Sequence, residues 1–205
     1  MSPPPSVPPV TSASAAARAR LFQLYLLAAM RPGPAVDTAL RALGAVREEM
    51  RGAAEAVRAT GIEQLEAGLR PYRELLGEPR RAGPALGLPP GSPLSGSQAY
   101  AFRLLPLWPA FDFLVHEHPS GFVWGLRFVR GASPPPPVPI TSIGDLRPWS
   151  LVREEFLAQC PAAQREDAWG TFCDYSLWLS YAPGGAMHEV VVGFDFDLLH
   201  LVTVL

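Results

Sequence analysis

The chain has 205 residues, of which 48% are apolar and 18% are charged, and its formal net charge is −2. This length suits one domain, or one domain with a small helical extension, and the apolar content is ample for a core. A charge so close to zero gives no long-range attraction to nucleic acid or to an anionic membrane, so we expect neither as a partner.

Composition also bears on chemistry and location. Every basic side chain other than histidine is Arg, and neither Lys nor Asn occurs. Both have A-rich codons, so this bias indicates a GC-rich bacterial genome more than selection for guanidinium chemistry, and it excludes lysine-dependent mechanisms. Cys160 and Cys173 are too few for a disulfide framework, and no apolar run reaches the roughly 18 residues that cross a bilayer. We therefore expect a cytoplasmic protein.

The first 30 residues combine a leader with a helix. Residues 1–13 are rich in Pro and Ser and are expected to be disordered. A helix is predicted over residues 14–30, with Ser12 or Ser14 as its N-cap and Pro32 after its end. Residues 1–36 contain three Arg and no acidic residue, so a targeting segment stays an alternative for this region.

Two further helices are predicted up to residue 79. Apolar residues recur every three or four positions over residues 35–59, which is typical of an amphipathic helix. Thr60 and Glu63 have the spacing of a capping box, which predicts a third helix over 61–76. These stripes favour helices packed on each other or on the rest of the chain over a coiled-coil dimer. Residues 80–98 are rich in Pro and Gly and are expected to be a linker.

From residue 99 onward the sequence predicts strands, and all five Trp lie here. Alternating apolar residues predict a short strand near 100–104, a hairpin of 111–117 and 122–130 around the turn HPSG, and a pair at 174–181 and 188–197. The apolar segment 198–205 is either another strand or the tail of the previous one. A helix is expected over 146–159 and a helical turn over 162–168. The order predicts an α+β fold, with the two to three N-terminal helices packed on or beside one antiparallel sheet of five to six strands and one inserted helix.

A pair of histidines is the clearest candidate for metal chemistry. His116 and His118 stand two residues apart on a predicted strand, so both imidazoles are expected on one face. Zinc or iron sites on sheets take such a pair together with a third ligand from elsewhere. His188, His200, Asp195 and Asp197 are the residues that could supply it. No HExxH or CxxC motif accompanies the pair, and its simpler interpretation is two histidines on an edge strand.

Catalytic groups of other kinds are incomplete. Cys173 has no recognisable nucleophile motif around it, and Asp195 with Asp197 is more simply a solvated face than a general acid–base pair. We therefore predict no catalytic residue and no resident cofactor.

The aromatic residues suggest a binding surface. Trp178 lies between Ser176 and Ser180 on the strand face opposite Tyr175 and Leu177. If no helix covers that face, Trp178, together with Trp124, would be an anchor for a protein partner. The leading hypothesis is therefore a small protein-interaction domain of the inhibitor, immunity or adaptor type. Two alternatives stay open, namely a metal-binding protein or metal-dependent enzyme that uses the histidines, and a small-molecule pocket between helices and sheet. The sequence does not indicate the oligomeric state.

Overall fold

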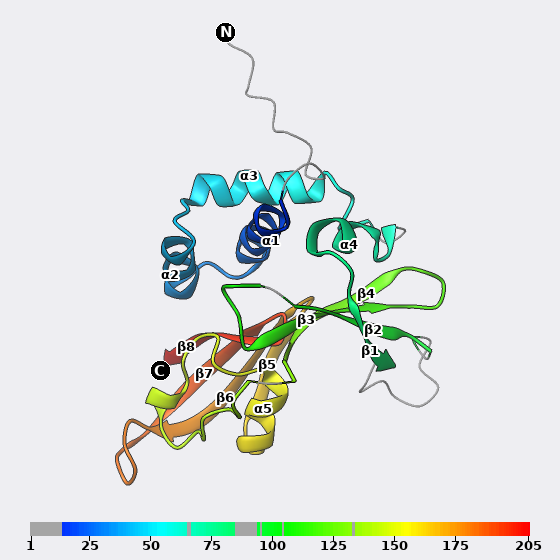
Figure 1. Ribbon diagram of the computed structural model, residues 1–205. Helices are drawn as coiled ribbons and strands as arrows, with labels where there is room; N and C mark the ends of the chain where they lie inside the picture. Colours follow the sequence, from blue (N-terminus) through cyan, green and yellow to red (C-terminus); the bar gives the residue numbers. More distant parts are fainter. Residues whose placement is uncertain (1–13, 65–66, 85–93, 95, 104, 133) are drawn as a thin grey trace.

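The computed structural model describes residues 14–64, 67–84, 94, 96–103, 105–132 and 134–205 (Figure 1). The leader expected over residues 1–13 lies outside the described residues. The helices are α1 (Ala15–Ala29), α2 (Pro34–Ala42), α3 (Arg47–Arg58), α4 (Arg70–Leu76) and α5 (Arg153–Gln159), with a 3-10 turn at Ile143–Asp145. The strands are β1 (Arg80–Pro84), β2 (Gln98–Phe102), β3 (Phe111–Glu117), β4 (Val123–Arg130), β5 (Gln164–Trp169), β6 (Phe172–Ser180), β7 (Met187–Asp195) and β8 (Leu198–Val204).

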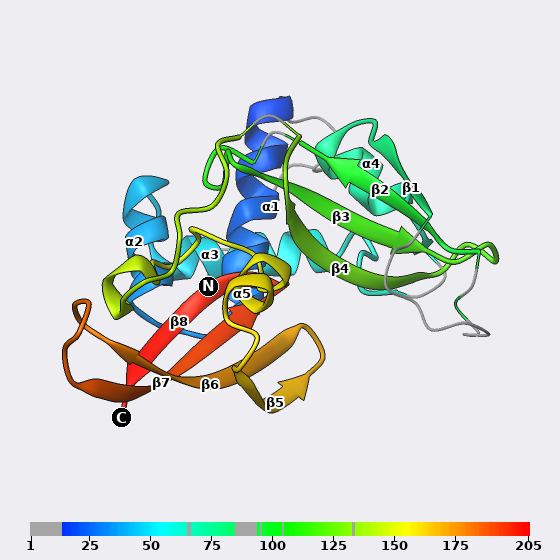
Figure 2. The same cartoon turned by 90° about the horizontal axis from the view of Figure 1, so that it is seen from below.

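The fold is α+β, as predicted, but the strands form two sheets and not one. The first sheet has the order β1-β2-β3-β4 and the second has the order β5-β6-β7-β8, and every pairing is antiparallel. Figure 2 shows the two sheets side by side beneath the helices. Both hairpins expected from alternation form, and the segment after residue 198 is a strand of its own.

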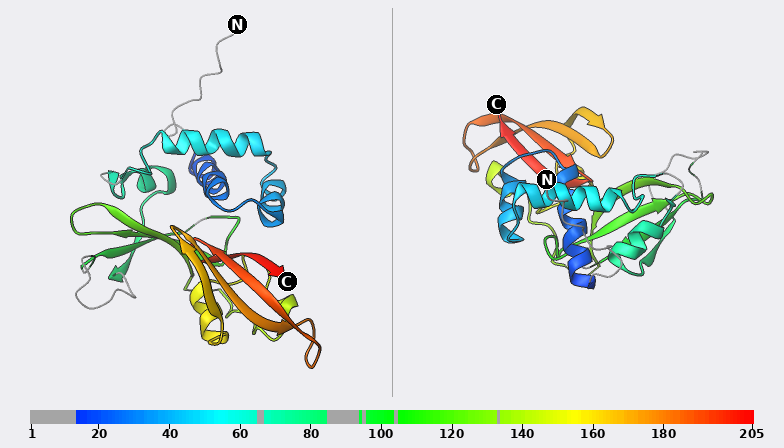
Figure 3. Two further views of the ribbon diagram at one scale, coloured as in Figure 1. Left: turned by 180° about the vertical axis from the view of Figure 1, so that it is seen from behind. Right: turned by 90° about the horizontal axis from the view of Figure 1, so that it is seen from above.

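Helix α1 is the centre of the helical layer. Its N-cap is Ser14, whose hydroxyl accepts a hydrogen bond from the Ala17 amide. Six consecutive residues, Phe22–Leu27, are buried, which is typical of a helix that is surrounded on all sides. Buried Gln23 is satisfied, because its side chain accepts from the Leu107 amide at 2.7 Å and donates to the Ala19 carbonyl. The larger core joins this helix to α2, α3, α4 and the first sheet. Figure 3 shows how these helices are arranged over the sheets.

The helix predicted over 35–59 is interrupted, which corrects that expectation. Gly44 has a φ of +58°, and the amide of Ala45 donates to the Leu40 carbonyl at 2.8 Å. This is a Schellman ending, in which a left-handed glycine closes the helix. Helix α3 then begins where the Glu49 carboxylate accepts from the Val46 amide.

The capping box expected at Thr60 and Glu63 does not form. The Thr60 hydroxyl donates instead to the Val57 carbonyl at the end of α3, and Glu63 pairs with Arg58 and accepts from Tyr25. Turns follow, and the third predicted helix is reduced to α4. It starts at residue 70 because Pro71 has no amide hydrogen to bond inside a helix and suits its first turn.

Two segments that lacked strand signals are edge strands. Arg80–Pro84, at the start of the expected linker, pairs with β2 and contains a bulge at Gly83, whose φ is +108°. Residues 164–169 form β5 on the edge of the second sheet, where a helical turn was expected over 162–168. Polar edge strands are held by main-chain hydrogen bonds with little burial, so alternation does not reveal them. The inserted helix forms, but only as α5.

The turn between β7 and β8 joins the two sheets. Phe196 and Asp197 both have positive φ, 53° and 63°, which is typical of a two-residue type I′ hairpin turn. The Phe196 carbonyl accepts a hydrogen bond from the Phe128 amide of β4 at 2.7 Å. The Phe196 amide donates to the Thr171 carbonyl. Its ring is buried against Phe113. This turn corrects the expectation that residues 194–197 continue one strand face.

Candidate functional site

One end of the second sheet carries an exposed apolar surface. Trp178 of β6 is opposite Glu189 of β7, and Met187 and Glu189 lie on the same face of β7. The amide of Leu205 donates to the Glu189 carbonyl, which places Leu205, one residue past the end of β8, beside Glu189. The exposed fractions are 61% for Trp178, 55% for Met187 and 71% for Leu205. We call this surface the tryptophan face, defined by Trp178, Met187, Glu189 and Leu205.

Tertiary packing explains why this face is open at one end only. The opposite face of the sheet packs on α5 through Tyr175, Leu177 and Val190 and forms a second core. On the same side as Trp178, but at the other end of the sheet, the guanidinium of Arg31 covers Gly193 so closely that a Cβ there would lie 2.5 Å from its Nη2. Within the described residues no helix covers Trp178, which is 61% exposed, and Ser176 and Ser180, which flank it, are buried.

A hollow borders the tryptophan face at the edge of β6. It has a volume of about 450 Å³ and lies between Ser176–Leu179 of β6 and residues 159–164, which connect α5 to β5. Glu166 and Glu189 also line it, and none of its lining residues is basic. The Glu166 carboxylate accepts a hydrogen bond from the Ser176 hydroxyl. We call this feature the edge hollow.

Trp124, the other predicted anchor, does not join Trp178. It belongs to β4 of the first sheet, where its Nε1 donates to the Ser97 hydroxyl at 2.9 Å and its ring lies 5.0 Å from that of His116. We predicted both tryptophans as anchors of one partner-binding face, and each stands on a strand that alternating apolar residues predict. Strand alternation says nothing about which sheet a strand joins, and the two tryptophans belong to different sheets.

The predicted metal ligands do not gather in one place, although His200 Nε2 lies 3.7 Å from Asp195 Oδ2. Buried His116 accepts from Arg127 Nε at 3.2 Å, and His118 bonds the Ser120 hydroxyl in the hairpin turn. His188 and Asp195 are at opposite ends of β7, about 23 Å apart at the usual rise of a strand. Among the described residues, no three His, Cys, Asp or Glu side chains gather as a metal site would require. The metal hypothesis therefore finds no support in this arrangement.

Asp195, His200 and Arg31 form a structural network. Fully buried Asp195 accepts from the main-chain amide and from Nε of Arg31, both at 2.8 Å. The same guanidinium donates to Asp174 at 2.6 Å, and His200 Nε2 lies 2.7 Å from the Arg31 carbonyl. Burial lowers the pKa of His200. This network fastens the α1–α2 connection to the second sheet, and it supplies the hydrogen-bond partners that a buried carboxylate such as Asp195 needs. Asp197, two residues on, points elsewhere because of the type I′ turn.

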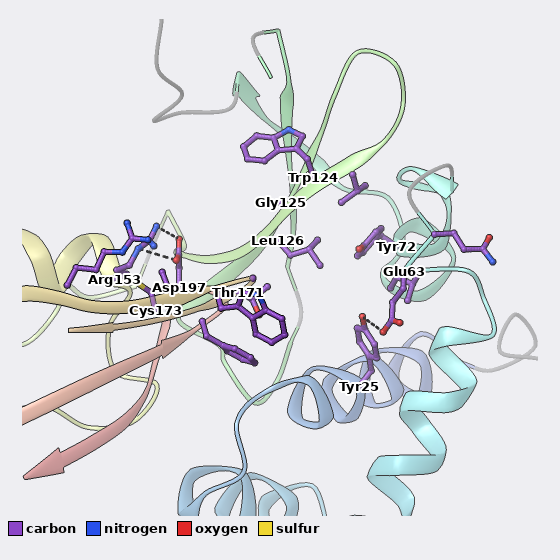
Figure 4. Close-up of a pocket in the computed structure, with 18 residues that line it drawn as sticks. Tyr25, Glu63, Tyr72, Trp124, Gly125, Leu126, Arg153, Thr171, Cys173 and Asp197 are labelled. Atoms are coloured by element: carbon purple, nitrogen blue, oxygen red, sulfur yellow. Dashed lines mark hydrogen bonds and ion pairs between the residues drawn. The ribbon is translucent and has the colours of Figure 1, made fainter. Parts of the chain in front are cut away.

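A groove runs between the helices and the two sheets (Figure 4). Its volume is about 720 Å³. Aromatic side chains come from each wall, namely Tyr25 of α1, Tyr72 of α4, Trp124 of β4 and Trp169 of β5. Trp169 is 80% exposed. We call this feature the inter-sheet groove.

Charged groups stand at the two ends of the inter-sheet groove. At one end Arg153 Nε lies 3.2 Å from Asp197 Oδ1, and burial raises the pKa of Asp197 against the opposing effect of the nearby guanidinium groups. At the other end the Tyr25 hydroxyl donates to Glu63 at 3.4 Å, and burial together with that carboxylate raises the pKa of Tyr25 to about 12. Figure 4 shows these two pairs facing each other across the groove.

Comparison of the chain with protein-family models, with curated proteins and with solved structures found no match. Within the described residues, no helix combines the length and apolar character needed to cross a membrane.

Proposed function

We propose that this chain is a protein-interaction domain that binds a partner protein through the tryptophan face. The observation that carries the proposal is the clustering of exposed apolar side chains. Four of the seven large hydrophobic side chains that are exposed in the described residues, Trp178, Tyr181, Met187 and Leu205, lie at one end of one sheet. A grouped set of this kind is typical of a binding surface, whereas single exposed apolar residues are not.

The composition of the tryptophan face supports the same proposal. Trp is the residue type most enriched among those that dominate binding energy at interfaces, because it buries a large area with little loss of side-chain freedom. Trp178 is set on a strand whose other face is packed on α5, so its backbone is held in place. A rigid aromatic anchor of this kind loses little conformational entropy on binding.

A site-specific crosslinking experiment tests the proposal. A photo-crosslinking amino acid replaces Met187 in one protein and Val46 in another, since Val46 is exposed but lies at the start of α3 in the helical layer. In extracts of the source cells, we expect a discrete adduct from position 187 only, and we expect Trp178→Ala to abolish it. An adduct that survives Trp178→Ala, or none from position 187, would contradict the proposal.

The inter-sheet groove supports a second candidate function, the binding of a small aromatic anion. Its volume is within the range of about 300–1,000 Å³ typical of ligand sites. Arg165 of β5 also lines it and makes no salt bridge with any described residue. In a thermal-shift screen of aromatic carboxylates, we expect a stabilising ligand whose effect is lost in Arg165→Ala. A ligand effect unchanged in that variant would place binding elsewhere.

A further inference from the structure

We infer that the edge of β6 at Trp178 accepts an extended basic segment of the partner, which adds as an antiparallel strand with an Arg or Lys side chain opposite Trp178. This inference rests on the proposed function and names the mode of binding and the chemistry of the partner. Three observations carry it: the direction of the main-chain groups of Trp178, the end of β5, and the charge around the edge hollow.

The main-chain groups of Trp178 point away from β7. The Glu189 carbonyl accepts from Leu205 on the β8 side, and in an antiparallel strand the N–H and C=O of one residue point to the same side. Glu189 therefore bonds toward β8, and Trp178, which is directly opposite it, belongs to a pair that exchanges no hydrogen bonds. The N–H and C=O of Trp178 are consequently directed to the other edge of β6.

That edge is open because β5 is too short to cover it. The pairing of β5 with β6 begins at Gln164, opposite Ser176, and runs away from Trp178. Residues 177–180 of β6 extend beyond the end of β5, and no main-chain hydrogen bond within the described part of the chain covers this edge. The edge hollow occupies the place where a further strand would lie. An unpaired strand edge is the template for β-strand addition.

The geometry of the pair fixes which side chain of the added strand faces Trp178. In an antiparallel hydrogen-bonded pair, the two residues exchange both main-chain bonds and their side chains share one face. The residue opposite Trp178 therefore has its N–H directed at β6 and its side chain beside the indole ring. Its neighbours in the segment direct their N–H groups away and their side chains to the other face.

The charge of the site selects a basic residue at that position. The edge hollow contains the carboxylates of Glu166 and Glu189 and no basic side chain. A guanidinium or ammonium group that extends over Trp178 gains a cation–π contact with the ring and lies between these carboxylates. An acidic or purely apolar segment would gain neither contact, so electrostatic complementarity favours a basic segment.

The test uses the full chain and an acetylated six-residue peptide of alternating Val and Arg, observed through amide shifts in NMR spectra. We expect saturable shifts at residues 176–180. Binding should weaken at least tenfold in Trp178→Ala and in the double variant Glu166→Gln/Glu189→Gln, and stay within twofold in the control Val46→Ala. Thermal unfolding of each variant checks that the loss is not due to misfolding. A matched peptide of alternating Val and Glu should not bind.

N-methylation of the peptide tests the strand geometry. Methyl groups on the Arg amides should weaken binding at least tenfold, because those amides face β6, whereas methyl groups on the Val amides should change it less than twofold. Equal binding of both methylated peptides, shifts centred away from residues 176–180, or no binding of the Val–Arg peptide overturns the inference. The proposed function fails separately, if crosslinking at Met187 gives no adduct that depends on Trp178.

Discussion

Replacement of Arg31 by methionine tests the network that fastens the helical layer to the second sheet. The change keeps much of the apolar stem but removes the guanidinium, which pairs with Asp195 and Asp174 at 2.8 and 2.6 Å. Asp195 is fully buried, so it would become a buried carboxylate without a cation. Such an uncompensated charge is strongly destabilising.

The expected loss of unfolding free energy depends on the hydrogen bonds and solvent exposure that Asp195 and Asp174 retain in the variant. Breaking a buried pair costs about 3–5 kcal/mol, but Asp195 retains its bond from the Arg31 main-chain amide, which favours the lower end. The Asp174 side chain is 26% exposed and adds less than about 1 kcal/mol. We therefore expect Arg31→Met to lower the free energy of unfolding by about 3–4 kcal/mol.

Urea unfolding at pH 7, followed by circular dichroism, measures this change. The double variant Arg31→Met/Asp195→Asn should be more stable than Arg31→Met, because the neutral amide oxygen still accepts from the main-chain amide and no buried charge is left. Arg70→Met, which removes an exposed pair with Glu74, should change stability by less than about 0.5 kcal/mol. A loss below about 1 kcal/mol in Arg31→Met, or a double variant no more stable than it, would refute the reasoning.

Three further predictions follow from burial. Burial and the neighbouring guanidinium lower the pKa of His116 from 6.5 to about 4. Protonation therefore favours the unfolded chain, so stability should fall as the pH drops from 6.5 to 4, and His116→Gln should flatten this slope in urea titrations. Gly193→Ala should destabilise the protein by about 1–3 kcal/mol through overpacking. Gly52→Ala, in open space on α3, should stabilise it by about 0.5–1 kcal/mol. Equal melting temperatures of the two variants would contradict both expectations. Maleimide should label half-buried Cys160 and not buried Cys173 in the folded protein, as mass spectrometry of the intact and denatured chain would show.

Much of the secondary structure was predictable because it depends on neighbours in the chain. Ser14 and Pro32 bracket α1, and the alternation of Tyr175 with Ser176 continues along the whole of β6. The turn HPSG between β3 and β4 needs only Pro119 and Gly121. The missed turn between β7 and β8 has a tertiary origin. The type I′ turn at Phe196 has neither Asn nor Gly, and its backbone is stabilised by burial of the ring and by bonds to the other sheet.

The sequence by itself determined that Trp178 points away from the packed face of β6, because side chains alternate along any strand. Only the tertiary structure decided that Trp178 stays exposed among the described residues, that β5 stops short of it, and that Trp124 belongs to another sheet. It also decided that Arg31 meets Asp195, 164 positions later in the chain. Strand order, strand length and ion pairing between distant residues depend on how the two sheets pack against the helices and against each other. That packing brings together residues whose separation along the chain gives no periodic signal.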